Sequence, residues 1–189
     1  MHSQIHPEIA NDSQAARWPA ILALFATGSL YMALPERLTA GPNWLLLVVV
    51  TVLVIPTIAA RRIGRPRLNF VLGLILSAVI TLAMIWSLGM LIAGLPVKRE
   101  TPVELLRAAV ALWLCNILVF ASWYWRLDAG GPHVRDRRAF HTDGDFLFPQ
   151  MTIPPHVMPR YQGWKPGFVD YLFLAFNTST AFSPTDVPV

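Results

Sequence analysis

The sequence predicts an all-α membrane protein with about four transmembrane helices and a short re-entrant or incomplete fifth helical segment. Of its 189 residues, 54% are hydrophobic and only 14% are charged, whereas soluble domains carry about 25% charged residues. The charges are absent from several long windows and crowded between them. This alternation is typical of a multi-pass membrane protein, whose expected partner is the lipid bilayer.

Four charge-free windows are long enough to hold a spanning helix, which needs about 20 residues. The third window is the longest, so its helix is expected to tilt or to extend past the bilayer edge. We expect the four-helix transmembrane region to cover residues 18–126 after a polar tail at 1–17. The helices are predicted near 18–34, 43–60, 69–94 and 104–126.

The start of the fourth helix is marked by the stretch Thr101-Pro102-Val103-Glu104. A threonine followed three residues later by glutamate predicts a capping box, and proline favours the first helical position. We therefore expect Thr101 to be the N-cap and Glu104 to complete the capping box.

Small residues recur at every fourth position of the third predicted helix, at Gly73, Ser77 and Thr81, and again at Gly89 and Ala93. Such a stripe lets another helix approach closely. The neighbour could be a helix of the same bundle or, in a homo-oligomer, a second copy. Asn116, in the middle of the fourth helix, is interpreted as an interhelical hydrogen-bonding residue, with a place on a transport pathway as the alternative.

The basic residues predict the orientation of the chain. With four spans, eleven lie on the side of the amino terminus and four on the other side. Because basic loops remain in the cytoplasm, we predict that the amino terminus, the 61–67 loop and the 127–166 segment are cytoplasmic. The eleven are Arg17, Arg61, Arg62, Arg65, Arg67, Arg126, Arg135, Arg137, Arg138, Arg160 and Lys165, and the four are Arg37, Lys98, Arg99 and Arg107.

Residues 127–166 form an irregular segment rich in glycine, proline, histidine and aspartate. It also carries large apolar side chains, among them Phe146, Phe148 and Trp164, which a solvated linker lacks. We therefore expect a compact cap that lies against the membrane surface.

Several residues of this segment could in principle ligate a divalent metal, although their spacing matches no established closed site. The alternative is turn formation, for which Asp-Gly-Asp is a signal. We find no nucleotide-binding, hydrolase, zinc-protease or redox motif, so neither enzymatic activity nor a cofactor is expected, and a membrane enzyme with its site in this segment is the third hypothesis. No nucleic-acid partner is expected either, because the basic residues lie in loops beside the apolar spans. The weak metal candidates are His133, Asp136, His141, Asp143 and Asp145.

Residues 167–189 are predicted to form a short, pore-helix-like segment. The charge-free run Tyr171 to Thr185 is too short to span a bilayer, so we expect a helix over 168–181 that Ser183-Pro184 ends. A helix that stops inside the membrane leaves its last carbonyls unsatisfied. We therefore expect the native fold to need chain beyond Val189. The pore-like candidates are Thr178, Thr180, Ser183 and Asp186.

Three stretches in order, "YWRLDAGGP", "DFLFPQM" and "FVDYLFLAFNTSTAFSPTD", resemble a conserved bacterial family of multi-pass inner-membrane proteins whose activity is not established. The resemblance covers roughly the second half of the chain and implies the bacterial inner membrane. Members of that family typically continue past "SPTD" into one more hydrophobic helix, whereas this sequence ends at Val189.

The segment 178–186 also distantly resembles a potassium-channel filter of the form T-x-T-T-V-G-Y-G-D, which implies a pore helix at 168–181. Three differences set it apart: Ser183 and Thr185 replace the two filter glycines, and Pro184 replaces the aromatic residue. The predicted orientation also places residue 167 inside the cell, opposite to a potassium channel. A channel-like or transport-like activity is the leading hypothesis. A structural or partner-binding membrane subunit is the alternative.

Overall fold

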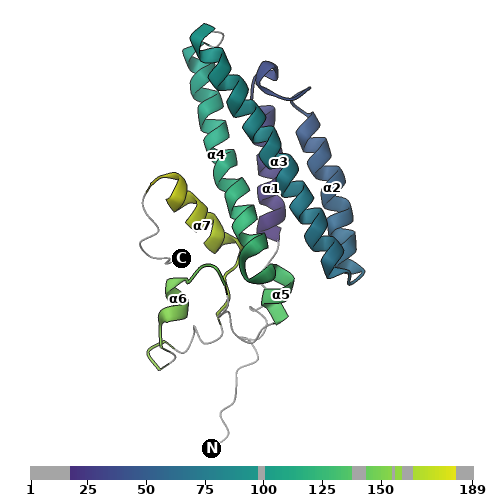
Figure 1. Ribbon diagram of the computed structural model, residues 1–189, viewed down its shortest axis with the longest axis vertical. Helices are drawn as coiled ribbons and strands as arrows, with labels where there is room; N and C mark the ends of the chain where they lie inside the picture. Colours follow the sequence, from purple (N-terminus) through teal and green to yellow (C-terminus); the bar gives the residue numbers. More distant parts are fainter. Residues whose placement is uncertain (1–17, 98–100, 138–143, 155, 159–163, 182–189) are drawn as a thin grey trace, which may run out of the picture.

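The computed structural model describes residues 18–97, 101–137, 144–154, 156–158 and 164–181, and within this part every regular element is a helix (Figure 1). The all-α prediction is therefore confirmed. Single 3₁₀ turns, η1 (Glu36–Leu38), η2 (Leu95–Val97) and η3 (Asp128–Gly130), lie between helices. The α-helices are α1 (Trp18–Met32), α2 (Leu45–Arg62), α3 (Pro66–Gly94), α4 (Pro102–Leu127), α5 (Pro132–Arg137), α6 (Pro149–Thr152) and α7 (Phe168–Ser179).

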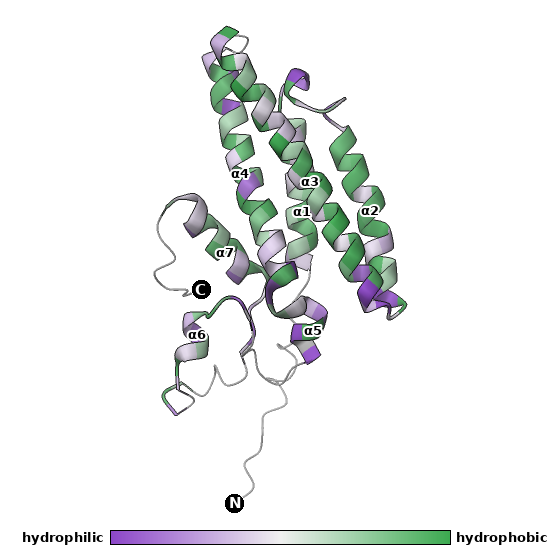
Figure 2. Ribbon diagram, in the orientation of Figure 1, coloured by the Kyte–Doolittle hydropathy of each residue, from purple (hydrophilic) through white to green (hydrophobic). Residues whose placement is uncertain are grey.

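Three helices of the described part, α2, α3 and α4, are long and apolar enough to cross a membrane. Figure 2 shows them as largely hydrophobic along their length, with a hydrophilic turn between α2 and α3. The fourth predicted span corresponds to α1, an apolar helix of 15 residues that is shorter than this requirement. Length and composition thus indicate a membrane protein and support three of the four expected spans.

Helices α1 to α4 pack as an antiparallel bundle in which each helix contacts the next and α1 also contacts α4. One small cavity is lined by a residue from each of the four helices, namely Ile21, Arg61, Asn69 and Trp125. The start of α1, the end of α2, the start of α3 and the end of α4 therefore meet at the same end of the bundle. At the opposite end, Arg37 from the α1–α2 connection lies 3.2 Å from Glu104 on the first turn of α4.

The predicted capping box at the start of α4 is confirmed. The Thr101 hydroxyl accepts a hydrogen bond from the Glu104 N–H at 3.3 Å, and the Glu104 carboxylate accepts one from the Thr101 N–H at 2.9 Å. Two of the free amides at the helix start are satisfied in this way, which fixes where α4 begins.

The first part of the small-residue stripe of α3, from Gly73 to Thr81, lies against α4 of the same chain. The prediction was wrong for its second part, because Gly89 and Ala93 are exposed. Ser77 is buried, and the indole N–H of Trp123 donates to the Thr81 hydroxyl at 2.9 Å. A Cβ atom built on Gly73 would overlap the guanidinium of Arg126 on α4. Asn116 is half-buried on α4 and, among the described residues, makes no side-chain hydrogen bond to a neighbouring helix.

Two hydrophobic clusters divide the interior. The first fills the space between α1, α2, α3 and α4. The second joins α1 and α4 to α7 and to the described part of the 127–166 segment, through Phe148, Phe168 and Tyr171 among others. Helix α7 is therefore packed onto the outside of the bundle, on α4 above all.

Candidate functional site

Helix α7 runs back along α4 and ends level with its middle. Phe168, at the start of α7, packs edge-on against Trp125 near the end of α4, with ring centroids 5.8 Å apart. Phe176, near the end of α7, packs against Trp113 with centroids 6.2 Å apart. The 12 residues of α7 extend about 18 Å at 1.5 Å per residue. This is roughly half of a spanning length, as Figure 1 shows beside α4.

A buried aspartate holds the start of α7 against the end of α4. Asp128, 0% exposed, follows α4 directly. One of its carboxylate oxygens accepts a hydrogen bond from the Tyr171 hydroxyl on α7. The other accepts one from the backbone N–H of Asp145 at 2.6 Å. Three segments that are distant in the sequence are thus joined at one carboxylate.

Arg135 completes this arrangement from α5. It is 2% exposed and donates to the carbonyl oxygens of Trp125 and Asp128, at 3.3 and 3.1 Å. Its guanidinium also lies over the ring of Tyr171, 5.1 Å from the centroid. A cation at the last carbonyls of a helix is favoured by the helix dipole. We call Asp128, Arg135, Asp145 and Tyr171 the junction.

The electrostatics of the junction keep the tyrosine protonated. Burial raises the pKa of the Tyr171 hydroxyl, the Arg135 guanidinium acts against this rise, and the neighbouring Asp128 carboxylate adds to it. Tyr171 is therefore the donor and Asp128 the acceptor. One residue earlier, the Asp170 carboxylate accepts a hydrogen bond from the Gly167 N–H at 2.8 Å. Burial raises the pKa of Asp170, and that hydrogen bond acts against the rise.

The backbone after α4 explains the two glycines of the stretch Asp-Ala-Gly-Gly. Ala129, Gly130 and Gly131 all have positive φ, at 53°, 77° and 89°. Glycine adopts this region without strain. A Cβ atom on Gly131 would also lie 2.8 Å from the carbonyl oxygen of Arg126. The turn redirects the chain so that α5 brings Arg135 back over the end of α4.

Aromatic rings surround the junction. Phe146 and Phe148 pack edge-on against Tyr171 with centroids 6.3 and 5.3 Å away, and Trp164 packs against Phe148 at 5.8 Å. The described part of the 127–166 segment therefore packs onto the start of α7.

The end of α7 carries the predicted pore-like threonines. The Thr178 hydroxyl donates to the carbonyl oxygens of Leu174 and Ala175, at 3.1 and 3.0 Å. The Thr180 hydroxyl donates to the Phe176 carbonyl at 2.8 Å. Because each hydroxyl proton is used within the helix, the hydroxyl oxygens can act only as acceptors toward another group. The other two candidates, Ser183 and Asp186, lie outside the described residues.

The weak metal candidates are not brought together in the described part. His133 is on α5, and Asp145 takes part in the junction through its backbone N–H. Among the described residues no group of three histidine, cysteine, aspartate or glutamate side chains could hold a metal ion. His141 and Asp143 lie outside the described residues, as does the side chain of Asp136.

No sequence pattern groups Asp128, Arg135 and Tyr171 as a cluster. The available signal was local: an acidic residue directly after a span, followed by two glycines, indicates a turn with a buried acceptor. The partner in α7 is 43 residues further along the chain.

The fold and the junction together define an all-helical membrane protein in which a short helix is held against a bundle. Comparisons with protein-family models, with curated proteins and with solved structures found no match for this chain.

Proposed function

We propose that the chain is a multi-pass inner-membrane protein with four spanning helices and a channel-like or transport-like activity centred on the end of α7. The observation that carries this proposal is the position of the end of α7 along α4. Helix α7 begins at the level of Trp125 and finishes beside Trp113, about halfway along α4. If α4 spans the bilayer, α7 is a re-entrant half-helix.

A helix that ends inside the bilayer exposes polar backbone groups at a cost in free energy, and this cost supports a polar pathway at the end of α7. The hydrocarbon core is about 30 Å thick, so a helix of about 18 Å ends inside it. The last turn holds Asn177, Thr178, Ser179 and Thr180 together with backbone carbonyls. Unsatisfied backbone groups in lipid cost several kcal/mol each, so irregular chain at this depth lines water or another protein surface. Half-helix ends near the midplane are also where transporters bind substrate.

The distribution of arginines supports an approach of α7 from the cytoplasm. The turn between α2 and α3 carries Arg61, Arg62, Arg65 and Arg67. This turn lies at the end of the bundle that also holds the junction. Basic residues in short loops favour the cytoplasmic side. An arginine-rich end beside the start of α7 therefore supports a half-helix that enters from inside the cell.

Cysteine labelling tests the polar pathway. The native Cys115 is buried and is first replaced by alanine. In membranes, a charged, membrane-impermeant thiol reagent is expected to label the Thr178→Cys and Thr180→Cys variants. The matched control is Phe173→Cys on the outer face of α7, which is expected to face lipid and to resist the reagent. Absence of labelling at both threonine positions would show that no aqueous path reaches them.

Transport itself is tested in sealed vesicles. Vesicles that contain the protein are expected to release an entrapped ion or small solute faster than empty vesicles. Thr178→Val and Thr180→Val, which keep the side-chain shape, should slow that release. Release that equals that of empty vesicles, over a panel of inorganic cations, anions and small organic solutes, would rule out the activity.

Orientation is tested at the exposed Arg65. The Arg65→Cys variant is expected to resist labelling from outside intact cells and to react after the cells are opened. Efficient labelling from outside would reverse the proposed topology.

A second candidate is a structural or partner-binding membrane subunit. The outer face of α7 favours it, because Val169 and Phe173 are 60% and 59% exposed at i, i+4 spacing. A second copy of the chain could cover this apolar face. Disulfide crosslinking of Phe173→Cys between copies, without solute release from vesicles, would favour this candidate.

A further inference from the structure

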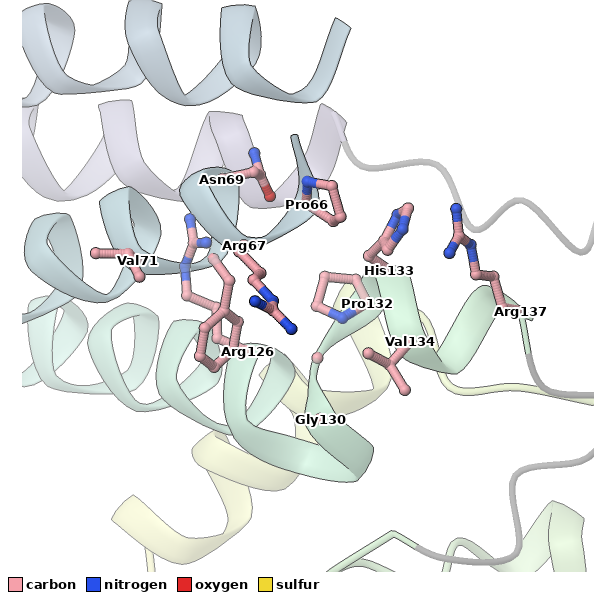
Figure 3. Close-up of a pocket in the computed structure, with 12 residues that line it drawn as sticks. Pro66, Arg67, Asn69, Val71, Arg126, Gly130, Pro132, His133, Val134 and Arg137 are labelled. Carbon is pink, nitrogen blue, oxygen red and sulfur yellow. The ribbon is translucent and has the colours of Figure 1, made fainter. Parts of the chain in front are cut away.

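A cavity of about 470 Å³ lies between the start of α3 and the segment that follows α4, apart from the end of α7. Figure 3 shows its lining residues arriving from α3 on one side and from α4, η3 and α5 on the other. Its position places it at the arginine-rich end of the bundle.

The cavity is strongly basic. Arg67, Arg126 and Arg137 line it together with His133, and none of the lining residues that the structure describes is acidic. Arg67 and Arg137 are exposed, so they form its rim. Three guanidinium charges around one cavity repel each other unless an anion lies among them.

Arg126 is the buried base of the cavity. It is only 6% exposed, and its Nε has no hydrogen-bond partner among the described residues. The guanidinium lies 5.7 Å from the centre of the Trp125 ring and against Gly73, where only a glycine leaves room for it. A buried charge with an unused donor is costly unless a ligand completes it.

Apart from Asn69, the rest of the lining is apolar and continues along the outside of α3. Phe70, Val71 and Val134 line the cavity. Val71 is exposed, and so is Ile75 one turn further along the same face of α3. An anion bound among the arginines could therefore carry an acyl chain along this face. Guanidinium groups match phosphate oxygens with paired hydrogen bonds, and basic pockets between spanning helices suit phospholipid headgroups.

We propose that this cavity binds a phosphate group, with Arg126 as its buried contact and Arg67 and Arg137 as its rim contacts. The phosphate belongs either to the headgroup of an anionic phospholipid or to a soluble anion, and the apolar face beside Val71 and Ile75 favours the lipid. This site does not depend on the function proposed for α7.

The experiment measures thermal stabilisation of the full chain in detergent, because a ligand that binds the folded state raises its unfolding temperature. One arm titrates phosphatidylglycerol against phosphatidylcholine. The other titrates inorganic phosphate against chloride at equal ionic strength. Native mass spectrometry counts the lipids retained in each sample.

The rim variants are Arg67→Gln and Arg137→Gln, both exposed, and the matched control is Arg65→Gln. Arg65 is also exposed and lies two residues before Arg67, but it does not line the cavity. Each rim variant is expected to weaken the apparent affinity about tenfold, whereas the control leaves it unchanged within about twofold. Because Arg126 is buried, the test does not rely on replacing it.

Stabilisation by phosphatidylglycerol alone, weakened only in the rim variants, supports a lipid-borne phosphate. The same pattern with inorganic phosphate, and no preference between the lipids, supports a soluble anion. Absence of stabilisation in both arms, or an equal loss of affinity in Arg65→Gln, overturns the proposal.

Discussion

The two ends of the bundle use charge in opposite ways. At the junction end, Asp128 and Arg135 are buried and connect three segments of the chain. At the opposite end, Arg37 and Glu104 form an ion pair at 3.2 Å whose side chains remain 46% and 41% exposed. The same kinds of residue are therefore internal at one end and solvated at the other.

Chain connectivity explains the difference. At the opposite end, short connections join α1 to α2 and α3 to α4, so the helices are adjacent without further help. Helix α7 is separated from α4 by residues 128–167, and a long loop costs entropy to close. Buried polar contacts occur where the chain has to fix this distant element. The comparison indicates that the junction positions α7, whereas the opposite end needs no such contact.

Replacing Asp128 is expected to have the largest effect. Asp128→Ala removes the acceptor of two hydrogen bonds and leaves the Tyr171 hydroxyl and the Asp145 N–H buried without a partner. Hydrogen bonds to a charged group contribute about 1.5–3 kcal/mol each, so we expect a loss of about 3–6 kcal/mol. Thermal unfolding in detergent measures this loss of stability.

The matched control for Asp128→Ala is Asp145→Ala. Asp145 is exposed and enters the junction only through its backbone N–H, which alanine keeps. The control removes an equal charge and should unfold close to the unmodified protein. Equal destabilisation by both variants would show that the buried carboxylate is not what holds the junction.

Removing only the Tyr171 hydroxyl should have an intermediate effect. Tyr171→Phe keeps the ring that packs against Phe148 and lies under Arg135 but deletes one donor to Asp128. The expected loss is about 1.5–3 kcal/mol. Tyr124→Phe is the control, since the Tyr124 ring packs against Phe146 in the same cluster. Limited proteolysis should also show earlier release of α7 in the Tyr171 variant only.

Two glycines on α3 allow the effect of close packing on stability to be distinguished from the effect of helix propensity. Gly73→Ala would place a methyl group on the Arg126 guanidinium, whereas nothing lies within 4 Å of a Cβ atom on Gly89. We expect Gly73→Ala to destabilise the fold by about 1–3 kcal/mol through overpacking. Gly89→Ala should stabilise it by up to about 1 kcal/mol. If both variants unfold alike, Arg126 does not occupy this position.

Much of the helical framework follows from the sequence, because the absence of charge over some 20 residues is a direct physical requirement of the bilayer. The predicted helix at 43–60 is Leu45–Arg62, that at 69–94 is Pro66–Gly94, and that at 104–126 is Pro102–Leu127. The short helix expected at 168–181 is Phe168–Ser179. Caps and prolines set these ends locally, so they differ by only a few residues.

The junction did not follow from the sequence, because it depends on contacts between residues far apart in the chain. The sequence offers the Asp145 carboxylate as a possible metal ligand, but in the structure its backbone N–H makes the interaction. The sequence also predicts Arg126 as a cytoplasmic charge, but it is buried against α3. No residue pattern predicts which charge near the end of a span turns inward.

The smallest effect is expected at the opposite end. Glu104→Gln removes the ionic part of the pair with Arg37, while the amide oxygen can still accept the hydrogen bond from the Thr101 N–H. Exposed ion pairs contribute little and are screened by salt. The melting temperature of this variant should therefore equal that of the unmodified protein at high salt and fall only slightly at low salt. A loss similar to that of Asp128→Ala would contradict the contrast between the two ends, since it would show that a solvated pair holds the bundle as firmly as the buried junction does.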